Sequence, residues 1–111
     1  MHSDRMEAGE QLSLACQLMG PAFVERKKSI TRDLLAHVET TEELPDGFAY
    51  RFASADPWLR TVAEFVEIER QCCPFFTFEI VVEPNDGPLW LRLRGSDQIK
   101  AFIRSELSAE S

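Results

Sequence analysis

The sequence lacks several features that mark large classes of proteins. It has no apolar run of about 18 residues, which a membrane-spanning helix needs, and its opening stretch MHSDRMEAGE has no apolar segment typical of a secretory signal. It also has no Gly-rich loop that could cradle a phosphate group. We therefore expect a cytoplasmic protein that does not enter the membrane.

Basic residues are scarce. There are 12 Lys and Arg against 19 Asp and Glu, which gives a formal net charge of −7. Such a charge repels a phosphate backbone, so the composition opposes nucleic-acid binding. The densest basic cluster, ERKK at 25–28, is expected to be the solvated face of a helix.

Cysteine and histidine are rare as well, with three and two residues. An odd number of cysteines without an export signal opposes a disulfide framework and predicts reduced thiols. His2 belongs to the polar N-terminal stretch and His37 to the far end of a predicted helix, so neither is placed to act as the base of a thiol nucleophile. The sequence therefore favours a non-enzymatic protein.

The length of 111 residues suits one domain with one hydrophobic core. Residues 1–10 are polar and lack periodicity, which predicts a disordered tail. Residues 11–108 are predicted to form the single domain. No low-complexity tract or linker interrupts them.

Alternating apolar and polar positions predict strands, whereas apolar spacings of three, four and seven predict helices. The predicted strands cover 11–18, 38–44, 47–53, 75–82 and 89–94. The predicted helices cover 22–38, 56–73 and 95–107, the last with Ser96 as its N-cap. This order predicts an α+β fold, namely a ferredoxin-like βαββαβ antiparallel sheet extended by a C-terminal strand and helix.

A ferredoxin-like sheet would bring the three cysteines together. In that topology the strands at 11–18 and 75–82 are antiparallel neighbours, so Cys16 would lie on the same rim as Cys72 and Cys73. Adjacent cysteines point in different directions on a helix and can share one ion only where the helix unwinds, which Pro74 promotes.

Glu69 is the polar residue that fits its predicted surroundings least. At 100° per residue it falls on the same helical face as Val62, Val66 and Cys73. A carboxylate in an apolar stripe is costly if it is ionised and unpaired, so it should be hydrogen-bonded, protonated or coordinated. We expect Glu69 to point inward beside the cysteines.

Three thiolates, or two with a carboxylate, suit a thiophilic ion such as Zn²⁺, Cd²⁺, Hg²⁺ or trivalent arsenic. The first hypothesis is therefore a small protein that binds a soft metal or metalloid ion through Cys16, Cys72, Cys73 and Glu69. The alternative is a structural or protein-interaction domain, because free cysteine also behaves as a small buried hydrophobe.

The predicted strand at 89–94 places Trp90, Arg92 and Arg94 on the sheet face opposite the core. Paired charges across strands are most often ordinary surface stabilisation. A large aromatic side chain on an open face instead suggests self-association. We therefore expect a homodimer with these three residues at its interface.

The segments ELPDGFAYRF, ERQCCPFFTFEI and GPLWLRLRG, followed by a short helix, resemble a family of small uncharacterised bacterial proteins that share a Cys-Cys-Pro-Phe segment. Cys72, Cys73, Pro74 and Phe75 match that segment, and the resemblance covers most of the chain from the strand at 11–18 onward. A similar stretch resembles segments associated with some heavy-metal-responsive regulators, although no DNA-binding helix-turn-helix is evident here. The resemblance implies no defined activity and favours the metal hypothesis without assigning a metal.

Overall fold

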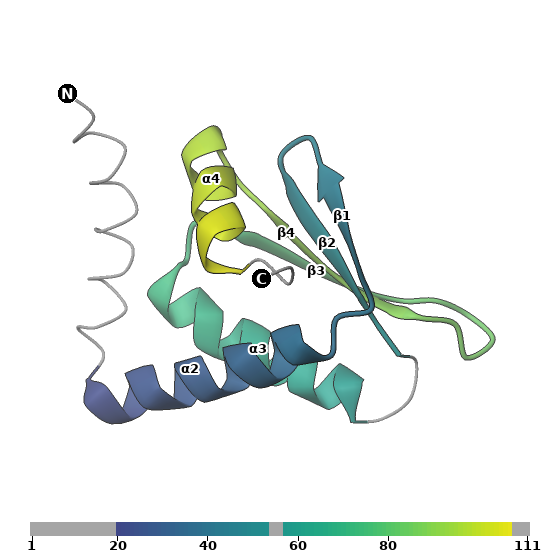
Figure 1. Ribbon diagram of the computed structural model, residues 1–111, viewed down its shortest axis with the longest axis horizontal. Helices are drawn as coiled ribbons and strands as arrows, with labels where there is room; N and C mark the ends of the chain where they lie inside the picture. The colour runs from purple at the N-terminus through teal and green to yellow at the C-terminus, as the bar shows by residue number, and fades with distance from the viewer. Residues whose placement is uncertain (1–19, 54–56, 108–111) are drawn as a thin grey trace.

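The computed structural model describes residues 20–53 and 57–107, which form an α+β domain (Figure 1). Its elements follow in the order α2 (Pro21–Ala36), β1 (Thr40–Leu44), β2 (Gly47–Phe52), α3 (Trp58–Cys72), β3 (Thr77–Val82), β4 (Leu89–Arg94) and α4 (Asp97–Glu106). Each element matches a range predicted from the hydrophobic pattern. The strand predicted at 11–18 and the tail at 1–10 lie outside the described residues. In the two described stretches, no helix is long and apolar enough to cross a membrane.

The order of the strands corrects the ferredoxin-like prediction. The four strands of the described sheet are antiparallel and run in the order β1-β2-β4-β3. A ferredoxin-like sheet would place the strand at 11–18 between those at 47–53 and 75–82. β4 occupies that position instead, because a tight turn makes it the hairpin partner of β3 while its other edge pairs with β2. The sheet thus does not have the topology from which Cys16 is predicted to lie beside the cysteine pair, and because Cys16 lies outside the described residues, its place stays a prediction.

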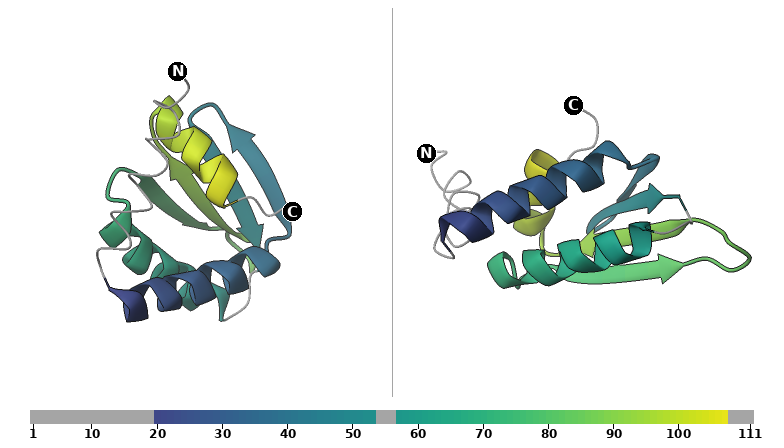
Figure 2. Two further views of the ribbon diagram at one scale, coloured as in Figure 1. Left: turned by 60° about the vertical axis from the view of Figure 1, so that its left-hand side comes forward. Right: turned by 90° about the horizontal axis from the view of Figure 1, so that it is seen from below.

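The central strand β4 has one apolar side and one polar side. Leu89, Leu91 and Leu93 are buried, whereas the alternate residues Trp90 and Arg92 are half-buried. α3 packs on β3 and β4, α4 packs on β2 and β4, and α2 packs on α3. Figures 1 and 2 show these helices together on one side of the sheet. Within the described residues, the other face of the sheet has no helix against it.

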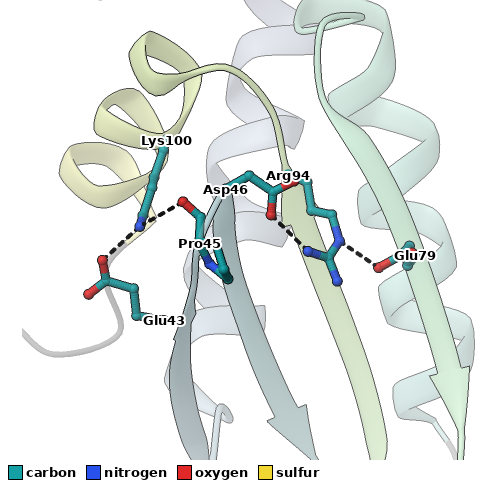
Figure 3. Close-up of polar contacts among 6 residues, drawn as sticks. All are labelled: Glu43, Pro45, Asp46, Glu79, Arg94 and Lys100. Atoms are coloured by element: carbon teal, nitrogen blue, oxygen red, sulfur yellow. Dashed lines mark hydrogen bonds and ion pairs between the residues drawn. The ribbon is translucent and has the colours of Figure 1, made fainter.

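Contacts at both ends of α4 hold this helix against the sheet. Ser96 caps the start of α4 by accepting a hydrogen bond from the backbone N–H of Ile99, which confirms the predicted N-cap. Lys100 pairs with Glu43 at 2.7 Å and donates to the carbonyl of Pro45 in the β1–β2 turn (Figure 3). These contacts position α4 over the β1–β2 hairpin.

The end of α4 is tied to β2 by a buried hydrogen bond. The hydroxyl of Tyr50 donates to the carbonyl oxygen of Leu107 at 3.0 Å. Burial raises the pKa of Tyr50 well above its ordinary value, so the hydroxyl keeps its proton and stays a donor. This bond joins residues that are far apart in the sequence and closes the domain.

Replacing Tyr50 with phenylalanine should lower the free energy of unfolding by about 1–2 kcal/mol, because the buried carbonyl of Leu107 loses its donor while the ring still fills the core. Urea unfolding followed by circular dichroism measures the change, with an unaltered m-value showing that the native fold is kept. A variant as stable as the wild type would contradict the role given to this bond.

Candidate functional site

The cysteine pair lies where α3 ends. Cys72 is the last helical residue, and Cys73 leaves the helix with φ −128° and ψ 69° while its N–H still donates to the carbonyl of Glu69 at 2.7 Å. Pro74 follows, has no N–H to continue the ladder and disfavours helical geometry in the residue before it. The predicted unwinding at the pair is therefore confirmed.

Both cysteines are part of the hydrophobic core. Cys72 and Cys73 are each only 1% exposed and belong to the same buried cluster as Phe76. Burial raises the pKa of the free Cys73 thiol to about 12, and the nearby Glu69 carboxylate adds to the effect. This thiol therefore carries its proton at neutral pH, which opposes the role of an activated nucleophile.

Glu69 points into the protein, as its place on the helix predicts. It is 1% exposed and lies 3.4 Å, through Oε1, from Nζ of Lys27, and the Cys73 thiol is near enough to lower the pKa of the carboxyl. Burial raises the pKa of the carboxyl, while the charge and hydrogen bonding of Lys27 act in the opposite direction. The result is a buried cluster of ammonium, carboxyl and thiol groups, which we call the Lys27–Glu69–Cys73 cluster.

Lys27 is the member of this cluster that the sequence analysis missed. It belongs to ERKK, for which the charge pattern predicts a solvated face, yet its side chain is only 22% exposed. The signal was present, because Lys27 interrupts the apolar series formed on α2 by Phe23, Ile30 and Leu34 at spacings of three and four. The same argument that singled out Glu69 on α3 applies to Lys27 on α2.

The four predicted metal ligands are only partly brought together. Cys73 and Glu69 are in contact, and Cys72 lies next to them in the chain, whereas Cys16 is outside the described residues. Among residues 20–53 and 57–107, no group of three or more His, Cys, Asp and Glu side chains is arranged to hold a metal ion. The described residues supply at most part of a coordination sphere.

A cavity of about 550 Å³ lies beside this cluster. Lys27 and Glu69 line it, together with residues of α2 and the end of α4. Glu69 thus borders the cavity, although its side chain is almost fully buried.

Glu69→Gln should flatten the pH dependence of stability. Because burial raises the pKa of Glu69 above its ordinary value of 4.5, its stabilising protonated form is complete below that value and is lost as pH rises through the folded-state pKa. The melting temperature of the wild type, relative to Glu69→Gln, should therefore fall as pH rises from about 4.5 towards neutrality. Glu67→Gln, on the exposed side of α3, is the matched control and should follow the wild type. Parallel curves for wild type and Glu69→Gln would show that Glu69 does not titrate abnormally.

Comparisons with known proteins do not provide a template for the site. No protein-family model, curated protein or solved structure matches the chain. The resemblance carried by the Cys-Cys-Pro-Phe segment stays a prediction, and the side chains of the cluster and the cavity are the remaining basis for a function.

Proposed function

We propose that the domain binds a thiophilic metal or metalloid ion at the end of α3, with the thiol of Cys73 as the central ligand and the carboxylate of Glu69 beside it. The observation that carries the proposal is the burial of both groups at the end of α3, where the Cys73 thiol and the Glu69 carboxyl influence each other's pKa, so that a soft sulfur ligand and an oxygen ligand lie close together. Cys72 and Cys16 are the further sulfur ligands that the proposal draws from the sequence, and they are tested under reducing conditions because Cys72 is disulfide-bonded in the structure.

Binding at this site requires the loss of protons. The thiol of Cys73 is protonated at neutral pH, so an incoming ion must displace that proton before sulfur can coordinate. Affinity should therefore weaken as pH falls. Ions that form strong bonds to sulfur meet this requirement best, which favours Cd²⁺, Hg²⁺ or trivalent arsenic over harder cations.

Lys27 influences which kind of ion the site can bind. Its ammonium group competes for the carboxylate of Glu69 and repels an approaching cation. Trivalent arsenic enters as an uncharged hydroxide at neutral pH and avoids this repulsion. The charges of the cluster therefore favour a metalloid over a divalent metal.

Metal titration of single variants tests the proposal. Under a reductant such as TCEP, Cd²⁺ should produce the ultraviolet thiolate-to-metal band, and arsenite should give a saturable heat in calorimetry. Cys73→Ser should weaken both by at least about 10-fold, because serine supplies no soft ligand. Cys72→Ser and Cys16→Ser report whether each of these thiolates takes part, and Glu67→Gln serves as the control.

The competing function is a structural or interaction domain with inert cysteines, which the burial of the free Cys73 thiol favours. Under the same reducing conditions, this alternative predicts that the thiols react with a thiol reagent only after denaturation. It also predicts that neither Cd²⁺ nor arsenite changes the melting temperature. Both results together would replace the metal proposal.

We also propose that two copies associate through the uncovered face of the sheet. Trp90 lies there between Arg51 of β2 and Val81 of β3, its partners on the neighbouring strands. Arg94 donates to Asp46 at 2.7 Å and to Glu79 at 3.0 Å within the chain (Figure 3). The predicted interface therefore centres on the aromatic ring and Arg92, while Arg94 is engaged in holding the sheet together.

Trp90→Glu should convert the dimer into a monomer in sedimentation velocity, because a carboxylate at the centre of an interface loses its hydration. Leu59→Glu is the control, since Leu59 is an exposed apolar residue of α3, on the helical side. A wild-type protein that sediments as a monomer at high concentration would contradict the proposal.

A further inference from the structure

Most of the residues that line the cavity beside α2 have no role in the metal proposal. Its wall on α2 is formed by residues at helical spacing, among them Lys28, Thr31, Arg32 and Leu35. Phe102 of α4 forms part of the opposite wall. The volume of about 550 Å³ falls within the range of pockets that enclose small organic ligands.

Positive charge collects at this cavity although the chain as a whole carries a net charge of −7. Lys27 is engaged with Glu69, but Lys28 and Arg32 form no ion pair with any residue of 20–53 or 57–107. Lys28 and Arg32 are exposed and lie one helical turn apart, so both side chains can reach the mouth of the cavity. Glu106 is the one exposed acid among the described lining residues.

The inner part of the cavity offers apolar contact and an unused polar atom. Phe102 is buried and Leu35 is half-buried, so both present apolar surface to an occupant. The hydroxyl oxygen of Thr31 is buried and has no hydrogen-bond partner among the described residues, whereas Oε1 of Glu69 has its ion pair with Lys27. An unsatisfied buried hydroxyl is costly, and a ligand with a polar group could satisfy it.

We propose that this cavity binds a small organic carboxylate with an apolar body. Lys28 and Arg32 receive the carboxylate, because a guanidinium group donates two parallel hydrogen bonds to a carboxylate. The apolar body of the ligand packs on Leu35 and Phe102. An inorganic anion has no apolar part and would leave these two side chains without a contact. Glu69 borders both this cavity and the proposed metal site, but no thiol takes part in binding the carboxylate.

Titration of ¹⁵N-labelled protein with sodium octanoate tests the inference. Saturable chemical-shift changes are expected in α2 and α4 and at Glu69. Octylammonium has the same chain with the opposite charge and should cause no saturable change. The double variant Lys28→Gln and Arg32→Gln should bind octanoate at least about 10-fold more weakly, because two charge-assisted contacts are removed.

Arg60→Gln is the matched control, because it removes an exposed cation of α3 that does not line the described cavity. It should bind octanoate like the wild type. The inference is overturned if octanoate causes no saturable change, if octylammonium binds equally well, or if the double variant binds as tightly as the wild type while keeping its melting temperature. Cys73→Ser should retain octanoate binding, so this test is independent of the metal titration.

Discussion

The leucines of β4 hold the domain together. Leu89, Leu91 and Leu93 lie on the central strand, are at most 2% exposed and stand opposite Phe52, Tyr50 and Phe48 of β2, in that order. Burying a side chain of this kind contributes about 1.5–3 kcal/mol. Both α3 and α4 pack on this apolar side of the sheet. α2 packs on α3 and so joins the same side of the domain.

The Lys27–Glu69–Cys73 cluster is the polar exception within this core. A carboxyl group that is 1% exposed needs a partner, and both α2 and the end of α3 supply one. Lys27 and Glu69 also line the cavity, so the contact that joins two helices lies at its wall. Packing and candidate chemistry are thus concentrated at one place, and a change there affects both.

Local charge and overall charge lead to different conclusions about ligands. A net charge of −7 opposes long polyanions such as nucleic acids, because they interact with the whole surface. Lys28 and Arg32 are nevertheless free of described ion pairs at a cavity sized for a small molecule, where only nearby charges matter. An acidic protein can therefore have a site for a small anion.

Sequence alone determined the local features of this protein. Each described helix and strand follows from the spacing of its apolar residues, and the cap at Ser96 and the helix end before Pro74 follow from single side chains. The inward direction of Glu69 follows from helical geometry alone. These properties depend on residues within one or two turns of each other, so a linear pattern contains them.

Tertiary structure alone decided which of these elements meet. The central place of β4 depends on the competition between strands for pairing edges, and alternation predicts a strand without predicting its neighbours. The pairing of Lys27 with Glu69 and the cavity beside them arise from the docking of α2 and α4 around the end of α3. Such contacts join residues distant in the sequence, and their geometry is set by how whole helices pack.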